Sequence, residues 1–272
     1  MEIIVRNREL VRCITGKRNI RMSDLKENEV LRQLYERKSV RSFLDISVED
    51  YKKEAILRAA FEAPTAGNQQ MYTILDITDE KLKEKLSVLC DNQPFIKKAP
   101  MVLVFVADAF RWTRVYEAAN VRYRKLEEGD IMLAIADTCI AAQNAVTAAW
   151  SLGIGSCYIG DILENCEDVR EVLNLPEYVI PATMVVFGYP TEQQLERKKP
   201  ARFERDYIVM ENTYRDIPLE SHKDAVIERA RKDGKQNFDF DHWTKAFADR
   251  KYNSDFSKEM SRSVRKYLKQ YQ

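Results

Sequence analysis

Histidine is nearly absent from this chain, which has only two in 272 residues, His222 and His242. A catalytic site of the Ser–His–Asp or Cys–His type would have to use one of them. Both lie in the charged C-terminal region, where an exposed helical histidine is far commoner than a catalytic one. No HExxH motif or carboxylate–histidine cluster suggests a metal site, and the sequence contains no Walker A loop. We therefore expect no bound metal ion and no site built on histidine.

Cysteine is sparse, and no two cysteines form a CxxC pair. The five are Cys13, Cys90, Cys139, Cys157 and Cys166. An odd, scattered set indicates neither a disulfide framework nor a zinc ribbon, and it predicts free thiols in a reducing cytoplasm. Near the N-terminus Arg6, Arg8 and Arg12 interrupt the apolar residues. They exclude a secretory signal peptide and leave a cleaved transit peptide open.

The chain has no excess of charge of either sign, with 44 Lys and Arg against 43 Asp and Glu. A net charge of +1 gives no sign of a nucleic-acid-binding surface. A hydrophobic content of 45% with 10% aromatic residues is typical of a globular protein. We expect one large domain over residues 27–218, an N-terminal extension over 1–26, and a charged helical C-terminal extension over 219–272.

Hydrophobic periodicity predicts alternating helices and short strands. Helices are expected at 28–37, at 48–62 behind a capping box of Ser47 and Asp50, at 79–90, at 166–174 and from 219 onward. Strands are expected at 71–77, 101–107 and 182–187, with a further one at 206–211. The charged stretch 110–128 has no clear period.

The segment 131–152 is apolar and long enough to span a bilayer. Asp137, Gln143 and Asn144 interrupt it, and each would be costly in lipid. We therefore predict no membrane span, but a helix buried in the core or in a subunit interface.

A short basic run stands out at Arg37-Lys38-Ser39-Val40-Arg41-Ser42-Phe43. It holds three cations and two hydroxyls with no acid between them. The planar fork of arginine can hold two phosphate oxygens at once, so the run is suited to a small doubly charged anion. Cations also favour the negative C-terminal end of a helix. The run alone leaves both interpretations open.

Three glycines, Gly153, Gly155 and Gly160, do not make a dinucleotide fingerprint, because they follow a helix and have the wrong spacing. Gly153 is expected to end that helix. The stretch from Gly155 to Gly160 is expected to bring its backbone close to a flat ligand, where a backbone N–H can reach a ring nitrogen.

A chain without an acid–base or metal set can still be an enzyme when a cofactor carries the chemistry. The basic runs 37–41 and 197–202 would bind a terminal phosphate, and Asn68 and Gln70 would hydrogen-bond a polar ring edge. A phosphate, a polar heteroaromatic edge and a redox-active ring together describe flavin mononucleotide (FMN).

Four segments now resemble one known family. They are Arg37 to Phe43 (R-x-S-x-R-x-F), Ala63 to Gln70 (A-P-T-A-G-N-Q-Q), the segment 141–161 ending in G-I-G-S-C-Y-I-G-D, and Val185 to Pro190 (V-V-F-G-Y-P). Their order and spacing over about residues 28–212 are similar to those of the FMN-dependent nitroreductases. The resemblance implies an α+β, three-layer fold with a central, mostly antiparallel sheet flanked by helices. It also implies an intertwined homodimer with FMN at the interface and the C-terminal extension packed on the dimer.

The resemblance also implies roles for individual residues. One subunit would contact FMN through Arg37, Lys38, Ser39 and Arg41. The partner subunit would contribute Pro64, Thr65, Ala66, Asn68 and Gln70. Tyr158, Ile159 and Gly160 would lie beside the ring, and Lys199 and Arg202 would complete the phosphate site. Arg41, Ile159 and Gly160 would be catalytic, with Arg41 stabilising the anionic reduced ring and a backbone N–H near N5.

Two segments depart from the family pattern. Thr65-Ala66 stands where the family usually has Ser-Ser, so one hydroxyl contact is lost. Met71-Tyr72 stands where Pro-Trp is typical, which alters the rigidity of the loop.

The implied reaction is a ping-pong transfer of hydride from NADH or NADPH, through flavin N5, to a nitroaromatic, a quinone or a similar small acceptor. Flavin reduction, dehalogenation or flavin breakdown on the same fold stay open. So does a non-catalytic flavin- or partner-binding protein, which the charged tail 219–272 would suit.

Overall fold

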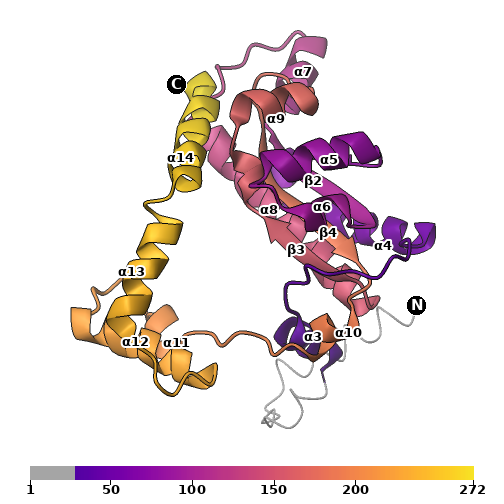
Figure 1. Cartoon of the computed structure of the whole chain (residues 1–272). Helices are drawn as coiled ribbons and strands as arrows, with labels where there is room; N and C mark the ends of the chain where they lie inside the picture. Colours follow the sequence, from indigo (N-terminus) through magenta and orange to yellow (C-terminus); the bar gives the residue numbers. More distant parts are fainter. Residues whose placement is uncertain (1–27) are drawn as a thin grey trace, which may run out of the picture. The chain divides into compact units, whose positions relative to one another are not determined.

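The computed structural model describes residues 28–272 (Figure 1), and the extension predicted over 1–26 lies outside the described residues. Contacts divide the chain into two units, Met1–Arg37 and Lys38–Gln272. The described part of the first unit contains helix α3 (Glu29–Glu36), as predicted. The Asn28 side chain caps it by accepting a hydrogen bond from the N–H of Leu31 at 3.0 Å.

The second unit is built on a four-stranded sheet in the order β1-β2-β4-β3. The strands are β1 (Tyr72–Asp76), β2 (Met101–Asp108), β4 (Val179–Gly188) and β3 (Gly155–Ile159). All three neighbouring pairs are antiparallel, which confirms the predicted α+β fold and sheet type. Strand β3 was not predicted, because it has only five residues and begins with the small residues Gly155 and Ser156. Such a short segment shows no alternating pattern of apolar residues.

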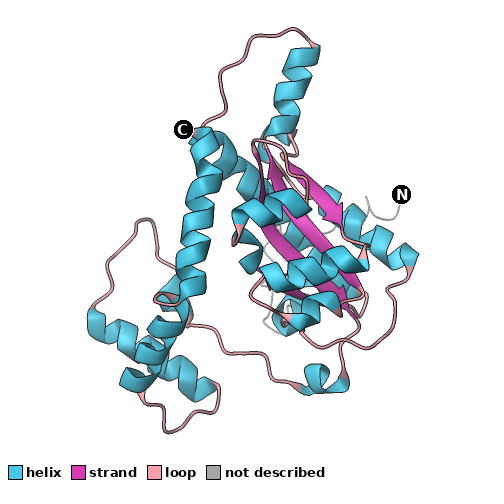
Figure 2. Ribbon diagram, turned by 45° about the horizontal axis from the view of Figure 1, so that its top comes forward, coloured by secondary structure: helices cyan, strands magenta, loops and turns pink. Residues whose placement is uncertain are grey.

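Helices cover both faces of this sheet (Figure 2), so the predicted three-layer arrangement is confirmed. Alternate residues of β2 divide between the faces. Met101, Leu103 and Phe105 meet α4 (Asp50–Phe61) and α8 (Glu128–Ser151). Val102, Val104 and Val106 meet α5 (Glu80–Leu89), α6 (Pro94–Lys97) and α9 (Cys166–Val172). This burial on both faces explains why β2 is a continuous apolar run.

A bulge interrupts the pairing of β2 with β4. Phe105 pairs with Thr183, but the next residue, Val106, pairs with Pro181, so Ala182 is left over. Proline has no N–H to give to the ladder, and a bulge is where a sheet tolerates it.

Helix α8 crosses one face of the sheet and has well-formed ends. Glu127 and Asp130 form a capping box at its start. At its end Gly153 has a left-handed φ of +76°, with hydrogen bonds from Gly153 N to Trp150 O and from Ile154 N to Ala149 O. That is the Schellman geometry, and it confirms the predicted role of Gly153.

By length and composition alone α8 could cross a bilayer. In the structure one of its sides is buried among the core residues of the sheet and α4, including Ala141, Ala145 and Ala149. The prediction of a helix buried in the core is therefore confirmed for that side.

Two local predictions are wrong, and one stretch that was left unassigned contains a helix. Helix α4 is capped by Glu49 without a side-chain hydrogen bond, so the capping box of Ser47 and Asp50 is wrong. The strand predicted at 206–211 is also wrong, since α11 (Arg205–Ile208) occupies it and no strand of the described sheet lies beside it. The unassigned stretch 110–128 contains α7 (Phe110–Ala118).

The C-terminal region is helical, as predicted. Its elements are α12 (Leu219–Lys232), α13 (Phe240–Lys251), α14 (Asp255–Leu268) and η3 (Lys269–Tyr271). The short elements η1 (Ala66–Asn68), η2 (Asp161–Leu163) and α10 (Glu192–Glu196) join the parts described above.

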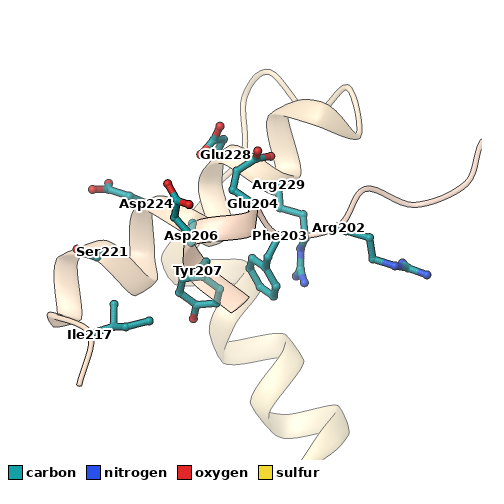
Figure 3. Close-up of a pocket in the computed structure, with 11 residues that line it drawn as sticks. Arg202, Phe203, Glu204, Asp206, Tyr207, Ile217, Ser221, Asp224, Glu228 and Arg229 are labelled. Carbon is teal, nitrogen blue, oxygen red and sulfur yellow. The ribbon is translucent and has the colours of Figure 1, made fainter. Parts of the chain in front are cut away.

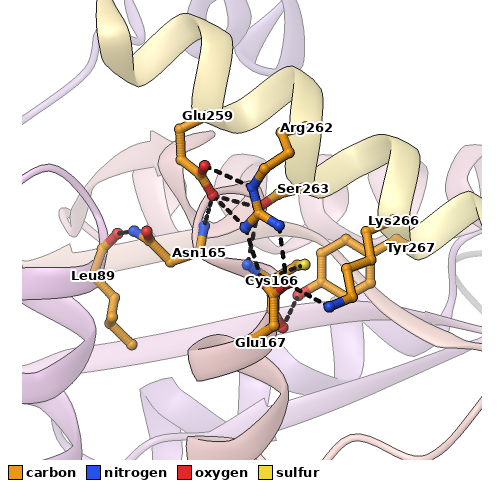
Figure 4. A network of polar contacts seen from close by, with 9 residues as sticks. All are labelled: Leu89, Asn165, Cys166, Glu167, Glu259, Arg262, Ser263, Lys266 and Tyr267. Carbon is orange, nitrogen blue, oxygen red and sulfur yellow. Dashed lines mark hydrogen bonds and ion pairs between the residues drawn. The ribbon is translucent and has the colours of Figure 1, made fainter.

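Helix α14 is fastened to the segment around α9 by a polar network (Figure 4). Arg262 forms ion pairs with Glu167 and Glu259, both at 2.7 Å, and Lys266 pairs with Glu167 at 2.5 Å. The side chain of Ser263 accepts a hydrogen bond from the N–H of Cys166 at 3.0 Å. The extension thus packs on its own chain at α14.

Candidate functional site

The basic run lies along strand β3. Ser39 forms a parallel bridge with Ser156, and the N–H of Val40 donates to the carbonyl of Ser156 at 2.9 Å. Phe43 forms an antiparallel bridge with Pro190. The fold therefore brings together three of the sequence motifs, 38–43, 155–160 and 185–190.

Two glycines allow this close approach. A Cβ on Gly155 would lie 2.6 Å from Cγ2 of Val40, and a Cβ on Gly188 would lie 2.8 Å from the Phe43 ring. Any side chain at either position would displace the basic run from the sheet.

Lys38 of the run and the nearby Arg197 are held by carbonyls, not by acids. The Lys38 ammonium donates to the carbonyl of Leu195 at 2.5 Å and to that of Arg197, and Arg197 donates to the carbonyl of Ser39. Within residues 28–272, Lys38, Arg41 and Arg197 form no ion pair with a carboxylate, unlike Arg32, Arg114 and Arg262. The cluster therefore keeps its positive charge, and it is suited to an anionic ligand.

The pKa of the Cys157 thiol is affected by two of these cations, Arg41 and Arg197. Burial raises the pKa of the Cys157 thiol, and the charges of Arg41 and Arg197 oppose that rise. Both guanidinium groups therefore lie close to β3. Arg197 was not among the predicted site residues, although it belongs to the second basic run.

The end of β3 presents an open backbone. The Ile159 side chain is buried in the core, and the Tyr158 hydroxyl donates to Gln143 Oε1 on α8 at 3.3 Å. Gly160 is exposed, and no atom lies within 4 Å of the place where a Cβ would be. Contact with a flat ligand at Ile159 and Gly160 would therefore have to come from the backbone.

The loop 63–70 is tightly wound. Gly67, Asn68 and Gln70 have left-handed φ values of 57°, 56° and 50°. The Thr65 hydroxyl accepts a hydrogen bond from the N–H of Gln70 at 3.2 Å. This conformation is unusual for residues other than glycine, so other parts of the fold must hold it.

Three side chains from α7 and α8 hold the loop. The Asp137 carboxylate accepts from the N–H of Ala66 at 2.9 Å, and the Trp112 indole donates to the carbonyl of Gln69 at 2.8 Å. Arg111 donates to the carbonyls of Gln70 at 3.0 Å and Tyr72 at 2.9 Å. None of the three was predicted, because each lies 39 to 71 residues from its partner.

The loop and the basic run lie at opposite corners of the sheet. The loop enters edge strand β1 at Tyr72, in the row of Ala107 and Ile180, whereas the run meets edge strand β3 at Ser156, in the row of Phe187. Three strand spacings and seven residues along β4 separate these corners by roughly 25 Å. One chain therefore does not bring Pro64 to Gln70 together with Lys38 to Arg41.

The other predicted phosphate ligands are Arg37, Lys199 and Arg202. Arg37 belongs to the first unit, where it follows α3 and its N–H donates to the carbonyl of Gln33 at 3.0 Å. Arg202 donates to the carbonyl of Pro200 at 3.4 Å, and Lys199 lies between Arg197 and Arg202 in the connecting segment.

Arg202 also borders a cavity of about 490 Å³ near α11 and α12 (Figure 3). The cavity is rimmed by the carboxylates of Glu204, Asp206, Asp224 and Glu228, and the Arg202 side chain points away from them. Arg229 lines the cavity too, but the four carboxylates outnumber the two arginines, so the lining as a whole is acidic. A second cavity, of about 430 Å³, borders the loop 63–70 and is lined by Gln69, Trp112, Tyr116 and Tyr123 among others.

Residues 28–272 contain no group of three or more His, Cys, Asp and Glu side chains placed to hold a metal ion. Their four cysteines are all free thiols.

The chain matches a known protein family, and it is similar to characterised relatives and to solved structures. A family model described as the Nitroreductase family matches residues 34–189. An FMN reductase (NADPH) of Bacillus subtilis is 34% identical over 189 residues, which are 69% of this chain and 75% of the relative. An oxygen-insensitive NADPH nitroreductase of Salmonella typhimurium is 35% identical over 181 residues, 66% of this chain and 72% of the relative. The solved structure of NfrA2 from B. megaterium has a TM-score of 0.76 at 28% identity and covers 90% of this chain and 97% of its own.

Proposed function

This chain belongs to the nitroreductase family, and we propose that it is an FMN-dependent oxidoreductase that takes hydride from NADH or NADPH. The acceptor is a small molecule such as a nitroaromatic or a quinone. The names of the relatives support this chemistry, since they include FMN reductases that use NADPH or NAD(P)H and an NADPH nitroreductase.

The observation that carries the proposal is the separation of the two half-sites. The cationic run with the open backbone at Gly160 lies at one corner of the sheet, and the left-handed loop 64–70 lies at the other. Two copies related by a two-fold axis would place the run of one against the loop of the other, and so complete two sites.

The outer side of α8 supplies a surface for such a dimer. Leu133 and Ile140 are two turns apart, and 51% and 41% of their surfaces are exposed. Met132 beside them is 66% exposed. Apolar side chains grouped on one side of a central helix mark an interaction surface.

The residues present fit FMN. Lys38, Arg41 and Arg197 form no ion pair with a carboxylate of residues 28–272, and the open backbone at Gly160 leaves room for a ring at close range. Arg37, Lys199 and Arg202 would bind the phosphate. Asn68 and Gln70 of the partner copy would hydrogen-bond the polar ring edge, and Pro64, Thr65 and Ala66 would pack beside it.

When bound, FMN supplies the hydride chemistry at its N5 atom. The protein supplies position and charge. Arg41 would stabilise negative charge on the reduced ring, and the backbone at Ile159 and Gly160 would fix the N5 side. Donor and acceptor would use one exposed ring face in turn, which makes the reaction ping-pong and needs no dedicated histidine.

Free flavin is a second candidate acceptor within the same chemistry. Two Bacillus subtilis relatives are named FMN reductases, at 34% and 33% identity. We place the protein in the cytoplasm, where its free thiols would stay reduced.

Anaerobic bleaching tests the proposed function. The purified protein should be yellow, should lose that colour with NADH or NADPH, and should regain it with a quinone. A colourless protein that cannot take up FMN would contradict the proposal. A yellow protein that neither nicotinamide reduces would instead support a non-catalytic flavin-binding protein.

A further inference from the structure

Asp137 is a buried acid in the middle of a core helix. Only 3% of its surface is exposed, and its neighbours on the buried side of α8 are small or apolar, such as Ala134 and Ala141. Burying a carboxylate is costly unless it is well paired. A helix that served only to cover the sheet would be better packed with alanine or leucine at this position.

The hydrogen bonding of Asp137 is incomplete. Its Oδ1 accepts from the N–H of Ala66, 71 residues away. Its Oδ2 is buried and has no partner among the described residues. Within residues 28–272, the only hydrogen-bond partner of this costly group is therefore the backbone of the loop 63–70.

The contact is made where the loop begins its left-handed turn. Ala66 directly precedes Gly67 and Asn68, both with positive φ. On the far side of the turn, Trp112 and Arg111 hold the carbonyls of Gln69 and Gln70. Asp137 is the one of the three that binds a backbone N–H, and it is also the one fixed within a core helix.

We propose that Asp137 is the positioning residue of the flavin-binding loop. Its carboxylate holds Ala66 N–H so that the turn presents Asn68 and Gln70 to FMN. This inference rests on the proposed function for its ligand, while the effect on the loop itself does not.

The test compares three variants of the full-length protein. Asp137→Ala removes the acceptor, and Asp137→Asn keeps an oxygen in the same place without the charge. Asp130→Asn is a control on the same helix, since it alters an acid that accepts from the N–H of Glu127 at 2.8 Å and pairs with Arg124 at 2.6 Å, and neither partner belongs to the loop.

The first readout is the affinity of each apoprotein for FMN, measured by quenching of flavin fluorescence. Asp137→Ala should weaken binding by about 10-fold to about 100-fold, which corresponds to one lost charge-assisted hydrogen bond. Asp137→Asn should stay within about fivefold of the wild type, and Asp130→Asn should match the wild type.

The second readout needs no cofactor. Hydrogen exchange of the peptide 63–72 in the apoprotein should be faster in Asp137→Ala than in Asp130→Asn. Equal FMN affinity for Asp137→Ala and the wild type, or unchanged exchange in the loop, would overturn the inference. A wild type that binds no FMN would refute the proposed function, while the exchange measurement would still decide the role of Asp137.

Discussion

At the residue scale, the arrangement of the basic run depends on glycine at position 155. A Cβ there would lie 2.6 Å from Val40 Cγ2 and 2.9 Å from Pro190 Cγ, and Val40 is fully buried. The neighbours cannot move away without displacing the run that carries Lys38 and Arg41.

Gly155→Ala should therefore lower the free energy of unfolding by about 1–3 kcal/mol, the usual cost of overpacking a core. Urea denaturation measures it. Gly129→Ala is the matched control, because a Cβ there meets nothing within 4 Å and the position is helical. The control should be neutral or slightly stabilising, and equal destabilisation by both variants would contradict the steric argument.

Replacing Arg37 tests its proposed role in binding the FMN phosphate. Arg37→Ala should weaken FMN binding by at least about 100-fold, because a bidentate arginine makes two charge-assisted hydrogen bonds. The control is Arg32→Ala in the preceding helix α3, which loses its ion pairs with Glu29 and Glu36. Titration of the apoproteins with FMN measures both, and unchanged affinity for Arg37→Ala would refute its assigned role.

The sequence shows the motifs that are proposed to contact the ligand, but it does not show the residues that support them. The basic run and the loop 63–70 are contiguous motifs, so their composition is visible locally. Asp137 and Arg197 act through contacts 71 and 158 residues away, and no local pattern shows such a contact. Asp137 did interrupt an apolar segment, and that was the one available signal.

At the element scale, both errors in strand prediction arise because a strand needs a neighbouring strand to pair with. Strand β3 is short and begins with glycine, and it exists because β4 pairs with it. The stretch 206–211 has β-branched residues, but it has no partner strand in the described sheet, and Ile208 and Val209 are 64% and 47% exposed. Strand propensity decides little without a neighbouring strand.

Helix α14 packs beside a buried acid, Glu164, which follows η2. Burial raises the pKa of Glu164 to about 7, and the nearby carboxylates of Asp161, Asp91 and Glu259 act in the same direction. Only 4% of Glu164 is exposed. The folded protein therefore holds a proton that the unfolded chain releases near pH 4.5.

Stability should consequently fall as the pH rises from about 4.5 to about 7, because the folded state binds more protons in that window. Glu164→Gln removes this titration. The variant should be more stable than the wild type at pH 8, by on the order of 2 kcal/mol, and no more stable at pH 4.5. Thermal unfolding at the two pH values measures the difference.

Glu167→Gln is the matched control, three residues away. Hydrogen bonds from Arg262, Cys166 and Lys266 hold the pKa of Glu167 well below its usual range, so its charge stabilises the fold above pH 4.5. That variant should be less stable than the wild type at pH 8. A Glu164→Gln variant that also loses stability at pH 8 would contradict the account of the buried acid.

At the scale of the whole molecule, we predict that the outer side of α8 forms the interface between the two subunits of a dimer. Ile140→Glu should shift the protein toward monomers and lower its FMN content together, because a charge in an apolar interface is costly. Val88→Glu is the control, since Val88 is also apolar and exposed, at 55%, but lies on α5 at the other face of the sheet. Sedimentation and flavin absorbance measure both, and a monomeric Ile140→Glu that keeps its FMN would rule out a shared site.

The fold could be predicted at this scale because its layers follow from hydrophobic period and chain order. The distance between the two half-sites, the basic run and the loop 64–70, could not be predicted. It depends on the strand order and on the register of β1, β2, β4 and β3. Only the assembled sheet shows that the loop and the run lie at opposite corners.

The most direct test of the account is therefore FMN binding by a mixed dimer. Arg41→Ala and Asn68→Ala chains carry different affinity tags, and the heterodimer is purified on both. Each homodimer has two damaged sites, whereas the heterodimer should have one intact and one doubly damaged site. We predict that the heterodimer binds about half as much FMN as the wild-type dimer and that NADPH or NADH bleaches it, while both homodimers bind weakly. A heterodimer that binds no more FMN than the two homodimers would contradict a site shared between subunits.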